Sequence, residues 1–281
     1  MASFDMLKRE TARPETKRDQ PEAVRRNFEI EAGGRKFEFT EFQPKEPSNV
    51  TLLHFPAFEI DGEKNAEGIH YSMDQRYKTL ALKGYGGDYS KPALVEALEK
   101  AVLKAGGGHV VLHGCSLGTS VVYDLISNPA DRSFLERCHV AGAILETPLI
   151  DKAHFSETFR SARDSSILSR MAELLNVRAE QSNTPKREPP VLNREMALEV
   201  LREKTNGKLI SVPVHVVLAK GDALVDNAKV MATLREQVPA LSSTTVTSSP
   251  GYLGHRVADY GAMWRNEAPI LNVFAAQNIR P

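Results

Sequence analysis

The sequence is short of cysteine, of long apolar runs and of any excess of one charge. Its 281 residues include only two cysteines, Cys115 and Cys138, which excludes a disulfide framework and a zinc site built from several cysteines. Lysine and arginine together number 36, as do aspartate and glutamate, so the formal net charge is zero. A globally basic nucleic-acid-binding protein is therefore disfavoured. So few cysteines are typical of a reducing compartment.

No stretch reaches the roughly 18 uncharged apolar residues that a membrane-spanning helix needs. The first 26 residues carry twelve charged side chains and no apolar segment long enough for the core of a signal peptide. We therefore expect a soluble, cytoplasmic protein in which residues 1–26 form a polar, flexible leader. Charged residues make up 26% of the chain and hydrophobic ones 41%, which suits a folded domain.

Short apolar segments alternate with helical patterns after the leader. The first element is a predicted antiparallel hairpin, in which apolar residues alternate on either side of Gly33 and Gly34. Residues 91–105 have apolar side chains at helical spacing after a Ser90 cap. Five β-branched-rich runs are typical of strands covered on both faces: 50–55, 77–83, 109–114, 139–146 and 212–219. Strands that alternate with helices predict an α/β fold with a mainly parallel sheet flanked by helices.

The spacing of the last two runs predicts an insertion. About 60 residues separate them, far more than a simple crossover needs. The intervening segment contains two amphipathic stretches joined by a polar, proline-rich connector. We therefore expect residues 149–211 to form a helical lid, which divides the core domain into residues 27–148 and 212–281.

A GxSxG motif stands where an apolar strand meets an amphipathic helix. Gly114, Ser116 and Gly118 supply it, beginning at the last residue of the run at 109–114. A serine at such a sharp turn projects its hydroxyl out of the sheet, and the flanking positions need glycine because side chains there would collide with neighbouring backbone. The next amide, that of Leu117, begins the helix and can stabilise an oxyanion. The pattern indicates a nucleophilic serine.

With this motif in this context, the chain resembles the α/β-hydrolase family over everything after the leader. In that family the serine is followed by an acid after a late strand and by a histidine near the end of the chain. The segment KGDALVD matches the acid loop and implies Asp222, and PGYLGH matches the histidine loop and implies His255. The resemblance thus implies a triad in the order Ser116, Asp222, His255.

Two other carboxylates remain open as the acid. Glu146 ends the run at 139–146, where some hydrolases of this family have their acid. Asp226 lies one helical turn beyond Asp222 and is more simply interpreted as a helix cap. The family's second oxyanion donor comes from a His-Gly-rich loop, which here reads HFPAF. Since proline has no N–H, the donor is expected to be the amide of Ala57, with that of Phe58 as the alternative.

These assignments predict a cofactor-free serine hydrolase that cleaves a small to medium carboxylic ester through an acyl-enzyme. The expected partner is the small-molecule ester, and no nucleic acid is expected. No metal is expected either, because no HExxH motif or clustered ligand spacing occurs. The substrate pocket is predicted to include Phe55, Phe58, Met171 and Leu175, although core packing is an alternative for the phenylalanines. The alternative functions are C–C bond hydrolysis, amidase or peptidase action on the same triad, and a non-catalytic ligand receptor.

Overall fold

The computed structural model describes residues 24–57, 62–83, 90–150, 154, 209–248, 254–255 and 257–277. These residues form one eight-stranded sheet in the order β1-β2-β4-β3-β5-β6-β7-β8. The strands are β1 (Arg25–Ala32), β2 (Arg35–Phe42), β3 (Val50–Phe55), β4 (Lys78–Leu82), β5 (His109–Cys115), β6 (Val140–Glu146), β7 (Val214–Lys220) and β8 (Leu241–Thr247). The helices are α1 (Gly62–Ser72), α2 (Lys91–Lys104), α3 (Leu117–Ser127), the 3-10 turn η1 (Pro129–Asp131), α4 (Arg132–Arg137), α8 (Asn227–Gln237) and α9 (Tyr260–Gln277).

The predicted hairpin is confirmed at one edge of the sheet. β1 and β2 pair antiparallel. Gly33 and Gly34 turn the chain with φ values of 54° and 72°, which residues with a side chain rarely adopt. β1 begins at Arg25, so the last two residues of the predicted leader, Arg25 and Arg26, belong to this strand.

The prediction of a mainly parallel sheet is also confirmed. β2 joins β4 antiparallel, and every later pairing, from β4 with β3 to β7 with β8, is parallel. Strands β3 to β6 are almost wholly buried along their length, which explains their continuous apolar sequences.

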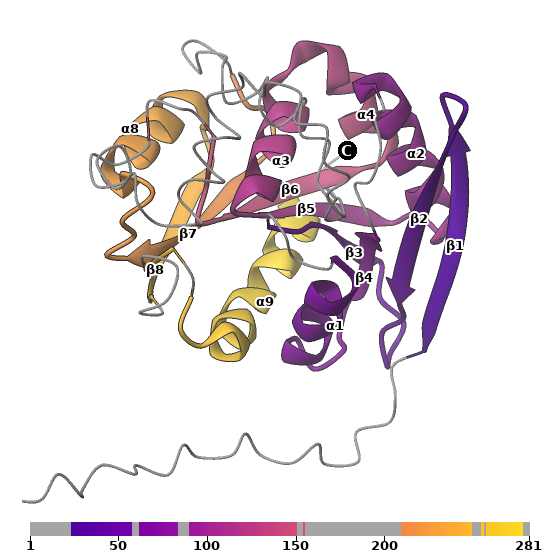
Figure 1. Ribbon diagram of the computed structural model, residues 1–281, viewed down its shortest axis with the longest axis horizontal. Helices are drawn as coiled ribbons and strands as arrows, with labels where there is room; N and C mark the ends of the chain where they lie inside the picture. Colours follow the sequence, from indigo (N-terminus) through magenta and orange to yellow (C-terminus); the bar gives the residue numbers. More distant parts are fainter. Residues whose placement is uncertain are drawn as a thin grey trace, which may run out of the picture.

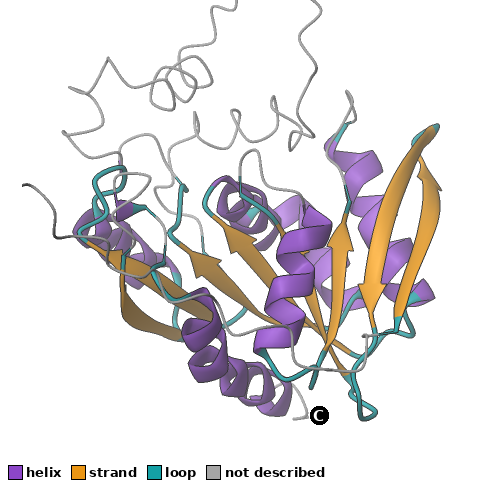
Figure 2. Ribbon diagram, turned by 60° about the horizontal axis from the view of Figure 1, so that its bottom comes forward, coloured by secondary structure: helices purple, strands orange, loops and turns teal. Residues whose placement is uncertain are grey.

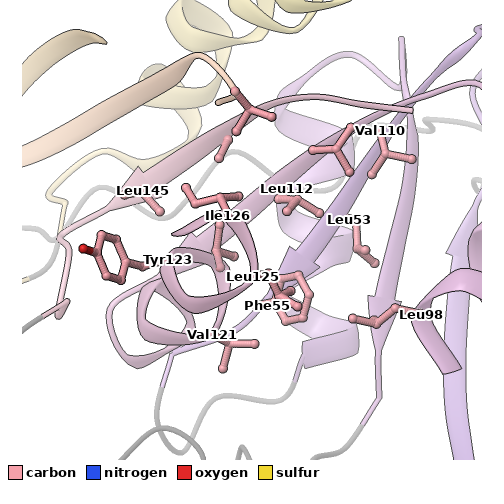
Figure 3. Packing of buried hydrophobic residues seen from close by; sticks show 14 of the residues in the cluster. Leu53, Phe55, Leu98, Val110, Leu112, Val121, Tyr123, Leu125, Ile126 and Leu145 are labelled. Carbon is pink, nitrogen blue, oxygen red and sulfur yellow. The ribbon is translucent and has the colours of Figure 1, made fainter. Parts of the chain in front are cut away.

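Helices cover both faces of this sheet (Figure 1). On one face α2, α3, α4 and α8 contribute to the larger cluster of buried apolar side chains, and on the other α1 and α9 contribute to a smaller one. Figure 3 shows part of the larger cluster, to which Val121 and Leu125 of α3 and Leu53 and Leu112 of the central strands all contribute. Burial of each such side chain is worth about 1.5–3 kcal/mol, so the layers hold one another in place.

Local sequence signals explain two of these helices. In α2 the Ser90 side chain accepts a hydrogen bond from the Ala93 N–H, and a proline occupies the first turn, as predicted. All eleven residues of α3 are buried, which fixes the helix that follows Ser116. In contrast, α1, α4 and α9 are not predicted by the sequence analysis, and α8 is implied only by the interpretation of Asp226 as a helix cap.

The parallel strands direct their carboxyl ends to one edge of the sheet (Figure 2). Ser116 follows β5, Asp222 follows β7, and His255 lies in the connection between β8 and α9. Open α/β sheets bind ligands at this edge. Of the residues predicted to form the lid, only Leu149, Ile150, His154 and 209–211 are described, so the lid lies outside the described residues. Among the helices that the structure describes, none is long and apolar enough to cross a membrane.

Candidate active site

Ser116 occupies the sharp turn between β5 and α3. Its φ of 50° and ψ of −116° put a residue with a side chain in sparsely populated backbone space. Such a conformation costs on the order of 1–3 kcal/mol and persists only where the surroundings enforce it. Two hydrogen bonds hold the turn: the Ser116 N–H donates to the Glu146 carbonyl at 2.8 Å, and the Ser116 carbonyl accepts from the Thr119 N–H at 2.9 Å.

The two glycines of the motif make this turn possible. A Cβ on Gly114 would lie 2.6 Å from the carbonyl oxygen of Gly118. A Cβ on Gly118 would overlap the Phe55 carbonyl oxygen and lie 2.7 Å from that of Pro56. Only glycine therefore allows the start of α3 to approach both β5 and the loop after β3 so closely.

His255 links the serine to a carboxylate. Its Nε2 lies 2.8 Å from the Ser116 Oγ. Its Nδ1 lies 2.7 Å from the Asp222 Oδ2. Gly254 brings the loop into position, because its φ is 75° and a Cβ there would lie 2.6 Å from the Gly221 carbonyl oxygen. The histidine side chain is only 7% exposed, so bulk water has little access to it.

The Asp222 carboxylate is held by backbone at the end of β7. Its Oδ1 accepts hydrogen bonds from the N–H groups of Leu224 at 2.8 Å and Val225 at 3.1 Å. A carboxylate that accepts at both oxygens leaves the proton on His255 Nδ1. The Nε2 is then free of a proton and accepts from the Ser116 hydroxyl. This arrangement is the one that can take a proton from serine.

The two rival carboxylates occupy other positions. Both ring nitrogens of His255 are engaged by Ser116 and Asp222, which leaves neither for Glu146. Asp226 is the N-cap of α8, where its Oδ1 accepts from two backbone N–H groups at 3.1 Å, so the interpretation of Asp226 as a helix cap is confirmed.

The residues predicted to be oxyanion donors lie on two segments next to the serine turn. Leu117 is the first residue of α3, and N–H groups in the first turn have no partner within their own helix. Ala57 directly follows Phe55 and Pro56, whose carbonyl oxygens pack against Gly118. The amides of Leu117 and Ala57 thus belong to two segments in contact at the serine turn.

The predicted pocket residues are only partly described. Phe55 is fully buried in the larger core cluster, which favours the packing alternative for this ring. Phe58, Met171 and Leu175 lie outside the described residues. Within the described ranges no group of three or more histidine, cysteine, aspartate or glutamate residues is arranged to hold a metal ion.

The sequence analysis misses a chain of buried polar side chains beside Ser116. His54 Nδ1 lies 2.8 Å from His113 Nδ1, and His113 Nε2 lies 3.2 Å from the Glu146 carboxylate. The Tyr260 hydroxyl donates to the same carboxylate at 3.0 Å. Burial lowers the pKa of His113 to about 3, and burial together with the charge that His113 would carry holds the pKa of His54 well below its ordinary value. The available sequence signal was a histidine near the end of each of two strands.

Comparisons with known proteins place this architecture in a class. A scan against protein-family models finds no match, and no curated protein emerges as a relative. Solved structures do match. A fungal esterase from Rhizomucor miehei is 16% identical, with a TM-score of 0.60 over 92% of this chain and 85% of the other. An α/β-hydrolase-fold protein from Chitinophaga pinensis is 12% identical, with a TM-score of 0.56 over 92% of this chain and 99% of the other.

A third neighbour agrees with these two. A carboxylesterase from Bacillus subtilis is 15% identical, with a TM-score of 0.52 over 89% of this chain and 90% of the other. The antiparallel hairpin, the mainly parallel sheet and the serine turn after β5 match the expectation from the sequence. The chain has the α/β-hydrolase fold.

Proposed function

We propose that this chain is a serine hydrolase in which Ser116, His255 and Asp222 cleave a carboxylic ester. The observation that carries the proposal is the unbroken hydrogen-bonded series from the Ser116 hydroxyl through the imidazole to the carboxylate, with steps of 2.8 Å and 2.7 Å. The strained backbone at the serine is a second support, because such strain is characteristic of functional turns. The known esterases among the structural neighbours favour the same class of reaction.

In the first half-reaction the Ser116 Oγ attacks the ester carbonyl carbon. His255 Nε2 takes the hydroxyl proton as the new C–O bond forms, and the carbonyl π electrons move to the oxygen. Asp222 accepts from Nδ1–H throughout and stabilises the imidazolium. When the tetrahedral intermediate collapses, the imidazolium donates its proton to the departing alkoxide, so an alcohol leaves and an acyl-serine remains.

The developing oxyanion needs donors at the serine turn. We assign this role to the backbone N–H groups of Leu117 and Ala57. The α3 N-terminus adds a favourable dipole, because the partial positive charge of a helix lies at that end. Loss of one such donor in a hydrolase costs about 10²–10³ in rate. The Pro56 position explains why the donor in the β3 loop is one residue further on than the glycines of the family motif.

In the second half-reaction water replaces the alcohol. His255 Nε2 removes a proton from the water as its oxygen attacks the acyl carbon, and the same proton returns to Ser116 Oγ when the acid leaves. Atoms and charge balance without any cofactor. An amide or a C–C bond would pass through the same tetrahedral steps, so the substrate class is decided by the leaving group and by the pocket.

The proposal is tested with a fluorophosphonate probe and intact-protein mass spectrometry. The Ser116 oxygen should displace fluoride and form one phosphonyl adduct, and Ser116→Ala should abolish both labelling and ester turnover. Ser120→Ala is the matched control. Ser120 is also buried and lies one helical turn along α3, where its hydroxyl donates to the Leu149 carbonyl. This control should still be labelled.

Two results would contradict the proposal. An adduct that maps to another residue would exclude Ser116 as the nucleophile, and a folded wild-type chain without any adduct would favour the ligand-receptor alternative. If labelling succeeds, a panel of p-nitrophenyl esters against the corresponding anilides separates esterase from amidase action. We expect the esters to be turned over at least tenfold faster, because an anilide leaving group demands more complete protonation.

A further inference from the structure

Glu146 contacts both sides of the candidate triad. Its backbone carbonyl accepts a hydrogen bond from the Ser116 N–H at 2.8 Å. This bond extends the β5–β6 pairing, in which Glu146 lies opposite Cys115. Through its carboxylate it accepts the hydroxyl of Tyr260 at 3.0 Å. One residue at the end of β6 therefore holds the nucleophile's backbone and, by its side chain, the chain segment that follows His255.

Tyr260 is the first residue of α9 and lies only five positions after His255. Its ring packs edge-on to Trp264 one turn later, with centroids 6.4 Å apart. Trp264 is itself fully buried and packs edge-on to His113, at 4.7 Å. The start of α9 is thereby docked against β5. The Tyr260 hydroxyl joins it to Glu146 at the end of β6, at 3.0 Å, and to Asn65 of α1, at 3.4 Å.

The donors that surround the Glu146 carboxylate fix its orientation. Since His113 is neutral and its Nε2 faces a carboxylate, this nitrogen carries the proton and donates. Its Nδ1 then accepts from His54 Nδ1–H. Two donors, His113 Nε2–H and the Tyr260 hydroxyl, converge on the same Glu146 oxygen, Oε2. Rotation of the side chain away from this position would break both hydrogen bonds in a buried site and would take this acceptor from His113 Nε2–H, at substantial cost, whereas the Tyr260 hydroxyl would still have Asn65 Oδ1 at 3.4 Å.

We propose that Glu146 and Tyr260 are positioning residues that set the distance between Ser116 Oγ and His255 Nε2, an inference that rests on the proposed function. The carboxylate acts as an acceptor and neither takes nor gives the catalytic proton. Because a displacement of about 1 Å between reacting groups can cost on the order of 10²-fold in rate, a tether at the base of the histidine loop has direct kinetic consequences.

Other contacts limit how far the loop moves when this tether is lost. Ser248 and Val257 form an isolated antiparallel bridge, and the Ala258 N–H donates to the Thr247 carbonyl at 2.8 Å. The pairing of Ser248 with Val257 should therefore hold, while His255 loses its fine alignment with Ser116. We expect a partial loss of rate, smaller than that caused by removing a triad residue.

The test compares Tyr260→Phe with Tyr123→Phe. Both changes remove only a hydroxyl. The Tyr260 hydroxyl lies 3.0 Å from the Glu146 carboxylate and 3.4 Å from Asn65 Oδ1. The Tyr123 hydroxyl, on α3 and away from the histidine loop, donates to Gln237 at 2.9 Å. Tyr260→Phe should lower kcat for p-nitrophenyl acetate and the rate of fluorophosphonate labelling about tenfold, with KM within about twofold. Tyr123→Phe should lower the melting temperature comparably and leave both rates unchanged. Equal rates in the two variants would overturn the inference.

Glu146→Gln separates positioning from acid chemistry. Glutamine keeps an oxygen that accepts from His113 and Tyr260, so kcat should fall less than tenfold. A loss of about 10⁴-fold would mean that the carboxylate charge itself serves His255, and it would overturn the positioning role. If the wild-type chain reacts with no fluorophosphonate at all, the proposed function fails. That result is distinguishable from a labelled wild type with a fully active Tyr260→Phe variant, which refutes the positioning role alone.

Discussion

Replacement of Asp222 by asparagine tests the acid assignment with least disturbance of shape. The side chain is fully buried, and each of its two oxygens has a defined partner. Oδ1 accepts from the N–H groups of Leu224 and Val225, whereas Oδ2 faces His255 Nδ1. An asparagine must choose which of these two positions receives its oxygen and which receives its NH₂.

The two backbone N–H donors, those of Leu224 and Val225, fix the orientation of the asparagine amide. If the NH₂ took the Oδ1 position, it would confront two N–H donors and leave both unpaired, at about 1–3 kcal/mol each. The amide oxygen therefore stays at that position and the NH₂ faces His255 Nδ1. A donor there requires Nδ1 to accept, so the proton moves to Nε2 and the imidazole presents N–H to Ser116. The general base is lost although the geometry is kept.

We expect a fall in kcat of about 10⁴, the loss known for the wrong histidine tautomer in a serine triad. This factor corresponds to about 5 kcal/mol of transition-state stabilisation, since each factor of ten is worth about 1.4 kcal/mol. The measurements are steady-state hydrolysis of p-nitrophenyl acetate and the rate of fluorophosphonate labelling. The melting temperature should change little, because the buried acceptor for the two N–H groups is retained.

Asp226→Asn is the matched control. Asp226 lies four residues after Asp222 and is the N-cap of α8. Its carboxylate, like that of Asp222, accepts hydrogen bonds from two backbone N–H groups. Asparagine is an equally good cap, so kcat and stability should both be unchanged. The reasoning is refuted if Asp222→Asn retains more than a tenth of the wild-type kcat, or if Asp226→Asn loses as much activity as Asp222→Asn does.

Three further predictions concern packing, pH and a buried ion cluster. Gly118→Ala should abolish labelling, or prevent soluble expression, because its methyl group would overlap the β3-loop carbonyls; normal labelling would contradict the close approach. Because the His113 pKa is lowered to about 3, the native state binds fewer protons than the unfolded state between about pH 6.5 and 3, so the free energy of unfolding should fall as pH falls through this window. In urea unfolding, His113→Gln should reduce the slope of the free energy of unfolding against pH by about 1.4 kcal/mol per pH unit. An unchanged slope would refute the lowered pKa of His113. Lys91 pairs with both Asp124 and Asp131, so Lys91→Met should cost about 3–5 kcal/mol of stability in urea unfolding, with kcat unchanged; a neutral effect would contradict the pairing.

The local elements of the fold are readable from the sequence because their signals are local. The alternation around Gly33 and Gly34 predicts the hairpin, and the continuous apolar runs predict strands covered on both faces. The motif of Ser116 between Gly114 and Gly118 predicts the strained strand-to-helix turn, because a side chain at either glycine position would collide with neighbouring backbone. Each of these patterns reports on backbone geometry and burial within a few residues.

The helices α1 and α9 are not predicted from such local patterns. The sequence of α1 is polar on average, and α9 contains Pro269 within its span, so neither presents a clean helical pattern. Their stability comes from docking on the sheet, as the burial of Ile69 and Trp264 indicates. Tertiary packing thus overrides weak local preference in these segments.

In the candidate site, the sequence predicts the positions of the residues along the elements, whereas the distances between their side chains depend on the tertiary structure. The sequence by itself determined that Ser116 stands at a strand-to-helix turn and that Asp222, Glu146 and Asp226 all follow or end late strands. It could not rank the three carboxylates by distance to His255, nor pair His54 with His113. Together with the pairing of Ser116 with His255, those relations join residues 33 to 139 positions apart, and they depend on how neighbouring strands are ordered and in what register. Only the assembled sheet brings such residues within hydrogen-bond distance, because strand register is fixed by packing over the whole core and not by any short segment.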